Sequence, residues 1–239
     1  MTVPLFREDA YMSEAEGRVV AHTPEGGVIL DQSVFFPTGG GQPGDSGVLR
    51  WGGVTLPVAT TVKGPGDTIV LVPSAPVALP PLDTHLTQHL DWERRHRHMR
   101  MHTALHLLSV AIPLPVTGGA IGEARSRLDF DMPEAPADRD GLEELLNEAV
   151  DRDLAVTESW ITDAELAAKP GLVKTMSVKP PVGVGRVRLV RIGEGRHEVD
   201  LQPCGGTHVA RTGEIGRLIL GKIEKKGRQN RRVHVSLDT

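Results

Sequence analysis

Cysteine is almost absent from this chain. Of its 239 residues only Cys204 is a cysteine, so no disulfide can form within the chain. Met1 to Ala10 is short, mixed and charged, and it lacks the apolar segment of a secretory signal. A lone cysteine without a signal segment is typical of a cytoplasmic protein, and we expect that location here.

Long apolar runs and aromatic side chains are also scarce. Nowhere do about 18 apolar residues follow one another, so we expect no transmembrane helix and no membrane partner. Phe, Trp and Tyr make up 3% of the chain, which argues against RNA recognition by extensive base stacking. The 27 glycines and 18 prolines favour β structure with many turns.

The order of short patterns predicts an α+β protein with two domains. Residues 1–88 hold short β-branched runs separated by Gly and Pro turns, which predict a small β-barrel domain. Residues 89–239 combine predicted helices and strands, and we expect the helices to pack on an antiparallel sheet. The predicted helices span 91–112, 140–154 and 163–169, and the predicted strands span 127–131, 156–160, 184–192, 218–223 and 232–237.

Two short motifs about a hundred residues apart suggest a metal site. His102 and His106 lie four residues apart in a predicted helix, so both imidazoles project from one face and can hold one ion. Cys204 and His208 flank two glycines, which allow a tight turn that brings both side chains to one side. Three histidines and a cysteine suit zinc, and they predict one Zn²⁺ per chain. Thr103 stands where a His-Glu-x-x-His metalloprotease has its general base.

Two points about this site stay open. Four protein ligands close a tetrahedral zinc, and closed sites are usually structural. Catalysis would need one ligand to yield, an expansion to five ligands, or a metal that only positions the substrate. His208 or a displaced water is the candidate for the variable position. Asp200 could orient a ligand imidazole, although an ordinary strand-end carboxylate is the plainer interpretation.

Four stretches together resemble a known family. Residues 91–108, 200–209 and 222–232 are similar to the editing domain of alanyl-tRNA synthetase, and residues 30–47 are similar to the glycine-rich loop of its preceding β domain. None of these stretches resembles the aminoacylation core of the synthetase. The chain is thereby identified as a member of the free-standing alanyl-tRNA editing proteins, the AlaX family, in their medium-length form. The resemblance implies a β-barrel domain with the glycine-rich loop at 1–88. It also implies a zinc-binding editing domain, like the second additional domain of synthetases, at 89–239.

The resemblance implies a trans-editing hydrolase. Its substrate would be alanine tRNA mischarged with serine or glycine, and the ester to the terminal adenosine would be hydrolysed with the help of a metal held by His102, His106, Cys204 and His208. Zinc can polarise an ester carbonyl, and Cys204 would be a ligand rather than a nucleophile. The alternatives are a non-catalytic zinc-stabilised RNA-binding module and a zinc hydrolase of a small ester or amide.

The glycine-rich loop offers candidate substrate contacts. A pocket that hydrogen-bonds the serine hydroxyl would reject alanine, and Ser33 and Thr38 are the candidates for that contact. The family often has threonine where Ser33 stands, and turn formation is the alternative role of both residues. Backbone approach and an amide would come from Gly39, Gly40, Gly41 and Gln42. The loop lacks the Gly-Lys-Ser/Thr ending of a P-loop, so we expect no nucleotide triphosphate.

A net charge of −4 conceals an uneven distribution. Residues 211–239 carry eight basic residues against three acids, and a second basic run spans 94–100. Such patches are compatible with contacts to acceptor-stem phosphates, although solvated faces would explain them equally. The candidate RNA contacts are Arg94, Arg95, Arg100, Lys222, Lys225, Lys226, Arg228, Arg231 and Arg232.

Overall fold

The computed structural model describes residues 1–174 and 185–238. It confirms the α+β class, and it divides into two compact units, Met1–Arg97 and His98–Thr239. Val184, which opens the predicted strand 184–192, lies outside the described residues. No helix in the described part of the chain has the length and apolar character needed to cross a membrane.

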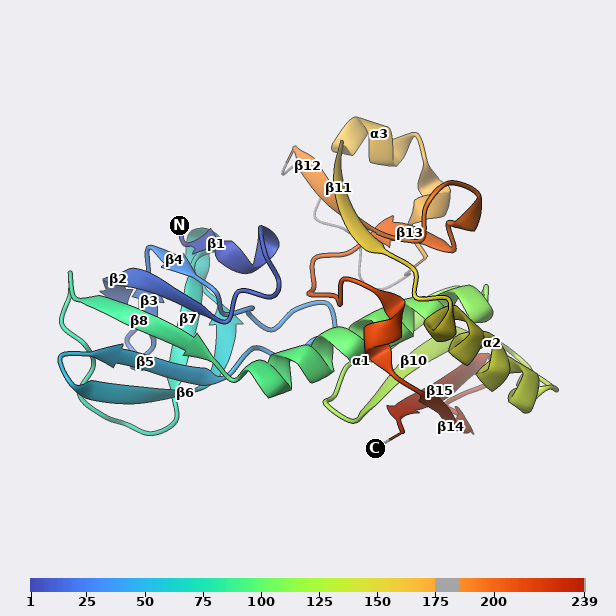
Figure 1. Cartoon of the computed structure of the whole chain (residues 1–239), viewed down its shortest axis with the longest axis horizontal. Helices are drawn as coiled ribbons and strands as arrows, with labels where there is room; N and C mark the ends of the chain where they lie inside the picture. Colours follow the sequence, from blue (N-terminus) through green and yellow to red (C-terminus); the bar gives the residue numbers. More distant parts are fainter. Residues whose placement is uncertain (175–184, 239) are drawn as a thin grey trace. The chain divides into compact units, whose positions relative to one another are not determined.

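The first unit is built on a closed antiparallel barrel (Figure 1). Its strands follow one another around the barrel in the order β2 (Glu14–His22), β3 (Val28–Leu30), β7 (Ile69–Pro73), β6 (Val54–Lys63), β5 (Gly47–Trp51) and β8 (His85–Leu90). Short β1 (Val3–Pro4) pairs with β4 (Gln32–Ser33) in parallel. Alternate side chains fill the interior, among them Val19, Leu30, Leu49 and Leu71, which are fully buried. Closure pairs the strand edges, and the core is mainly aliphatic, with Phe35 as its buried aromatic residue.

Helix α1 (Trp92–Ala111) carries the first of the two motifs. Its start is capped by Asp91, whose Oδ1 accepts a hydrogen bond from Arg94 N. It ends just before Pro113, which cannot continue a helix. The predicted helix 91–112 is therefore confirmed to within one residue at each end.

The second unit contains two antiparallel sheets. The larger has the order β14 (Leu218–Lys225), β15 (Asn230–Leu237), β10 (Arg125–Asp131) and β9 (Val116–Ala120). In Figure 1, α1 and α2 (Arg139–Asp151) lie on one side of it. The smaller sheet has the order β11 (Val156–Thr162), β12 (Arg186–Ile192) and β13 (Asp200–Pro203). A short 3-10 helix, η5 (Thr212–Ile215), comes later in the chain. Short α3 (Asp163–Ala167) follows β11.

Alternation along the strands explains the two faces of the larger sheet. Leu128, Phe130, Val233 and Val235 point to the buried side, whereas the residues between them are charged or polar. Helix α2 covers that buried side with Leu142, Leu146 and Val150, which follow its 3.6-residue period. Leu145, which the same period assigned to the apolar side, is exposed instead. The predicted packing of helices on an antiparallel sheet is thus present.

Candidate metal centre

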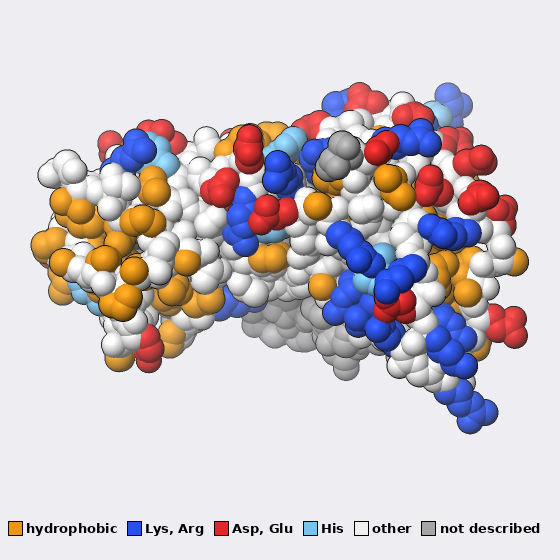
Figure 2. Space-filling view, turned by 90° about the horizontal axis from the view of Figure 1, so that it is seen from below, with side chains coloured by type: hydrophobic (Ala, Val, Ile, Leu, Met, Phe, Trp, Pro, Cys, Tyr) orange, Lys and Arg blue, Asp and Glu red, His pale blue; other side chains and the backbone are white. Residues whose placement is uncertain are grey.

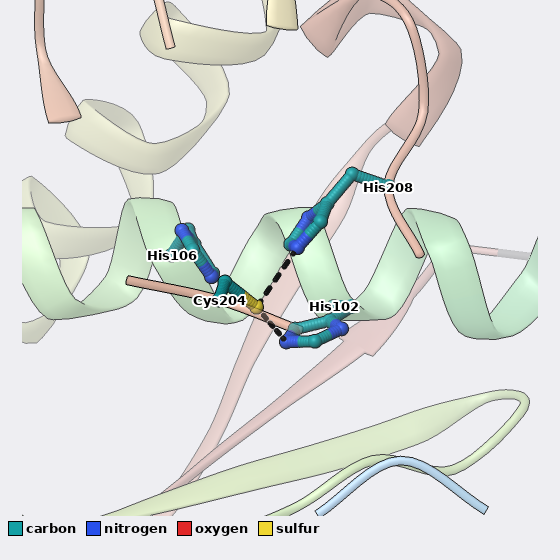
Figure 3. A group of neighbouring side chains, drawn as sticks. All are labelled: His102, His106, Cys204 and His208. Carbon is teal, nitrogen blue, oxygen red and sulfur yellow. Dashed lines mark hydrogen bonds between the residues drawn. The ribbon is translucent and has the colours of Figure 1, made fainter. Parts of the chain in front are cut away.

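Helix α1 presents two imidazoles to the interior of the second unit. His102 and His106 are each 6% exposed, and their ring centroids lie 5.4 Å apart. Residues four apart in an α-helix stand one turn apart on the same face. This places both rings where a second segment can meet them (Figure 3).

That second segment is the loop after β13. Cys204 Sγ lies 3.4 Å from His102 Nε2 and 3.2 Å from His208 Nε2 (Figure 3). One ligand atom from each of His102, His106, Cys204 and His208 can be chosen so that all four lie within 4.8 Å of one another. The structure therefore brings together the four residues that the sequence proposed as ligands.

The spacing of these donors suits a tetrahedral zinc. With Zn–S and Zn–N bonds of about 2.3 and 2.0 Å at the tetrahedral angle, sulfur and nitrogen stand about 3.5 Å apart. The two measured separations, 3.4 and 3.2 Å, are close to that value. A donor set of one thiolate and three imidazoles also binds zinc in preference to magnesium or calcium. The residues present therefore fit a zinc ion.

Asp200 holds His106 from behind. His106 Nδ1 lies 2.9 Å from Asp200 Oδ2, and the Asp200 carboxylate is buried. A carboxylate can only accept, so Nδ1 carries the proton and Nε2 is left as the donor atom for a metal. Lys174 Nζ donates to the other oxygen at 2.5 Å, and Gln202 Nε2 donates to Oδ2 at 2.7 Å. The orienting role considered for Asp200 is the one that its contacts support.

Thr103 orients the ring of His208 through a neutral hydroxyl group. Its hydroxyl lies 3.0 Å from the carbonyl of Met99 and 3.1 Å from His208 Nδ1. Because the hydroxyl donates to that carbonyl, it accepts from Nδ1 of His208. Nε2 of His208 then faces Cys204 unprotonated. The residue that replaces the protease glutamate therefore orients a candidate ligand.

The pKa values of Cys204 and His208 favour the metal-binding forms of these two residues. Burial acts to raise the pKa of Cys204, but the neighbouring His102 and His208 hold it well below its usual value. Burial lowers the pKa of His208, which keeps this imidazole neutral. A thiolate and a neutral imidazole are the forms that bind zinc.

His106 and Asp200 shift in opposite directions because they pair. Burial acts to lower the pKa of His106, but hydrogen bonds to Asp200 and Cys204 raise it to about 9. A metal that binds His106 therefore displaces a proton from its Nε2 atom. Burial acts to raise the pKa of Asp200, but His106 and Lys174 lower it to about 2. Asp200 is therefore ionised at neutral pH, and its negative charge faces the ring of a candidate ligand.

A buried arginine holds the loop that carries Cys204. Arg188 on β12 donates through Nη1 to the carbonyl oxygens of Cys204 and Gly206, both at 2.8 Å. Its Nε donates to Glu158 Oε2 at 2.7 Å, which balances the charge. No role was predicted from the sequence for Arg188, Lys174 or Gln202. Only Gln202 had a usable signal, because Asp200, Gln202 and Cys204 alternate along a strand and so share one face.

The glycine-rich loop belongs to the first unit. The side chain of Ser33 is buried, its hydroxyl donates to Gln88 Oε1 at 2.8 Å, and its oxygen accepts from Phe35 N at 3.1 Å. Thr38 is exposed, and its hydroxyl oxygen accepts from Gly44 N. The structure therefore gives Ser33 a supporting role for the loop, and a substrate contact by Ser33 stays a prediction.

The tip of this loop is a tight turn. Gly39 and Gln42 exchange two backbone hydrogen bonds of 3.0 Å. Between them Gly40 and Gly41 have φ values of 59° and 82°, a region that glycine adopts without strain. Backbone geometry thus accounts for these two glycines. The side chain of Gln42 is buried, so the structure does not present its amide to a substrate, and a contact by the backbone of the tip stays a prediction.

One of the predicted RNA contacts has to be corrected. Arg95 is 0% exposed, and its guanidinium pairs with Asp45 and donates to the backbone oxygens of Val34 and Ala10. It has no surface to offer to RNA. The neighbouring Arg94 is partly exposed and donates to Gly44 O, and Arg100 donates to Ile215 O.

The remaining basic candidates lie on β14, on β15 and in the turn between them. Figure 2 shows Lys and Arg side chains gathered on the second unit, on the side that carries these strands. Lys222 and Lys226 both pair with Glu224, and Arg232 pairs with Asp129 at 2.8 Å. Lys225 and Arg228 are exposed. The surface therefore keeps a positive excess after its internal ion pairs are counted.

Comparison with known proteins agrees with this architecture. Residues 187–234 match the family model described as the threonyl and alanyl tRNA synthetase second additional domain. The chain is 35% identical over 233 residues to an alanine–tRNA ligase of Pyrobaculum neutrophilum, which covers 94% of this chain and 25% of the ligase. The chain thus spans about a quarter of the length of the ligases it matches. Residues 187–234 therefore belong to a synthetase-type second additional domain.

Two further relatives match over their whole length. The alanyl-tRNA editing protein AlaX-M of Methanosarcina acetivorans is 33% identical over 248 residues, and that of Methanosarcina barkeri is 33% identical over 246 residues. Each alignment covers 99% of both chains. The chain belongs to the AlaX-M family of alanyl-tRNA editing proteins.

Proposed function

We propose that the protein is a trans-editing hydrolase that deacylates alanine tRNA mischarged with serine or glycine, using one zinc ion per chain. The observation that carries this proposal is the cluster of His102, His106, Cys204 and His208. Partners outside the cluster orient the rings of His106 and His208. The names of the full-length relatives, alanyl-tRNA editing proteins, support the substrate class.

The reaction is the hydrolysis of an activated ester. Water adds to the acyl carbon, the bond from that carbon to the ribose oxygen breaks, and the ribose oxygen takes up a proton. The products are a free amino acid and a tRNA with an intact terminal adenosine. A zinc ion held by the four donors would supply a Lewis acid that polarises the ester carbonyl.

The chain's own residues keep this centre in its reactive form. Asp200 and Thr103 fix protons of His106 and His208 on Nδ1, so Nε2 is the atom that each ring offers to a metal. The low pKa of Cys204 keeps the sulfur a thiolate. A thiolate used as a ligand is not the attacking group, so we assign no covalent intermediate to Cys204.

Selection against alanine and docking of the tRNA would use other parts of the chain. We assign recognition of the serine hydroxyl to the glycine-rich loop, where Thr38 offers an exposed side chain and residues 39–42 form the tip. We assign phosphate contacts to the basic surface of β14 and β15, which comprises Lys222, Lys225, Lys226, Arg228, Arg231 and Arg232.

A non-catalytic zinc-stabilised RNA-binding module is the second candidate. It is favoured by the number of donors, because four protein ligands leave no open position on a tetrahedral zinc. In that case zinc would fasten α1 to the loop after β13, and its removal would unfold the second unit.

A deacylation assay tests the proposal. Serine, glycine and alanine are each loaded on alanine tRNA, and ester loss is followed with the native protein and with a His106→Ala variant. We expect loss of serine or glycine with the native protein and background rates with the variant. His197→Ala, an exposed histidine of the same unit, is the matched control and should leave the rate unchanged. Ester loss at the background rate with the native protein would refute the proposal.

A further inference from the structure

Gly205 occupies a position where the protein itself does not require a glycine. Its φ is not in the positive range that favours glycine. A Cβ at this position would meet no atom within 4 Å. Neither backbone conformation nor packing therefore excludes a larger residue. What the absent side chain provides is open space beside Cys204.

Arg188 determines which way the backbone faces at this point. It donates to the carbonyl oxygens of Cys204 and Gly206, both at 2.8 Å. In a trans peptide the N–H points opposite to the C=O of the same unit, so the N–H of Gly205 points away from Arg188. Gly205 is exposed, and within residues 1–174 and 185–238 its N–H has no hydrogen-bond partner.

We propose that the Gly205 N–H donates a hydrogen bond to the carbonyl oxygen of the substrate's acyl ester, and that the glycine keeps the approach to this donor clear. This inference rests on the proposed function. When water adds to the acyl carbon, negative charge develops on the carbonyl oxygen, and a donor fixed in advance stabilises it. Gly205 is then a catalytic residue, and Arg188 is a positioning residue that acts through the peptide it holds.

The donor is fixed before substrate arrives. The Arg188 guanidinium is buried and is also bound to Glu158, so the two carbonyl contacts are held by a rigid planar fork. The loop is further tied by the hydrogen bond from Cys204 N to Arg188 O at 3.1 Å. Reorientation of the peptide during reaction is therefore unnecessary, which is the condition under which such a donor is most effective.

The test is a Gly205→Ala variant, with Gly205→Val as a graded second change. Gly171→Ala is the matched control, because Gly171 also has no positive φ and no atom near its missing Cβ. Three quantities are measured: ester loss from serine-loaded alanine tRNA, zinc content with thermal stability, and the Kd of a non-hydrolysable amide-linked seryl-adenosine. The amide analogue retains the carbonyl oxygen that the proposed donor would bind.

We expect Gly205→Ala to keep its zinc and its melting temperature, to deacylate about a hundredfold more slowly and to bind the analogue more weakly, with larger losses for valine. Gly171→Ala should behave as the native protein does. If both Gly205 variants deacylate and bind the analogue as the native protein does, this inference is wrong and the proposed function still stands. If a variant loses its zinc or its fold, Gly205 has a structural role instead. If the native protein does not deacylate serine-loaded alanine tRNA, the proposed function is wrong, and this inference is wrong as well.

Discussion

Replacing Asp200 with asparagine should weaken zinc binding while leaving the fold in place. The carboxylate accepts hydrogen bonds on both oxygens, from His106 Nδ1 and Gln202 on one and from Lys174 on the other. Asparagine is nearly the same size, but it has one oxygen and one NH₂ group. One of its two sides must then present a donor to another donor, and the negative charge behind His106 is lost.

The size of the effect follows from the role of such partners. Loss of a carboxylate that orients a ligand imidazole costs about 10- to 100-fold in metal affinity, which corresponds to about 1.4–2.8 kcal/mol. We expect a value near the upper end, because Asp200 is 3% exposed and water cannot replace it. Lys174 would then face the cluster without its counter-charge, which adds to the loss.

Competition with a chromophoric chelator measures the zinc Kd of the native protein and of Asp200→Asn. Asp129→Asn is a matched control, since Asp129 also binds two cationic side chains, Arg127 and Arg232, in the same unit. Its zinc Kd should not change. An Asp200→Asn protein with the native zinc Kd would refute the orienting role that we assign to Asp200.

Three more outcomes are expected. Chelation of zinc should abolish deacylation while far-UV circular dichroism is retained, whereas unfolding on chelation would favour the structural module. Arg95→Ala should lower the free energy of unfolding by about 3–5 kcal/mol, measured with denaturant, because it leaves the Asp45 carboxylate buried without its partner. Arg228→Ala should weaken tRNA binding at all sequences and reduce the slope of log binding constant against log salt concentration by about one. Arg196→Ala, at an exposed arginine, should change neither quantity. Equal slopes for the two variants would show that β14, β15 and the turn between them do not bind the RNA.

The repeating patterns of the sequence predicted the elements well because burial alone determines them. The predicted strands 218–223 and 232–237 correspond to β14 and β15, and the 3.6-residue period in 140–154 corresponds to α2. The predicted helix 140–154 ends too late, however. Helix α2 stops at Asp151, and Asp153 takes a positive φ of 46°, which no continuing helix allows.

Charge runs were a poorer guide than periodicity. Arg94 to Arg100 form one basic run in the sequence, but successive residues of a helix point about 100° apart. Arg95 therefore turns inward to Asp45, fifty positions earlier in the chain, while Arg97 remains exposed. The run itself contains no sign of this partner. Lys174 and Arg188 were missed for the same reason, since their importance depends on contacts with Asp200 and with the Cys204 loop.

The candidate ligand Cys204 is positioned by a sheet more than by its glycines. Strand β13 pairs with β12 from Asp200 opposite Ile192 to Pro203 opposite Leu189, and Cys204 N extends the ladder to Arg188 O. Side chains alternate along a strand, so Asp200, Gln202 and Cys204 share the face that meets α1. The same helix face carries His102 and His106. The same strand segment thus fixes the spacing between the candidate ligand Cys204 and Asp200, the carboxylate that orients His106. A β-bulge inserted between Asp200 and Cys204 would change this spacing, so that the two residues could no longer serve one metal site together.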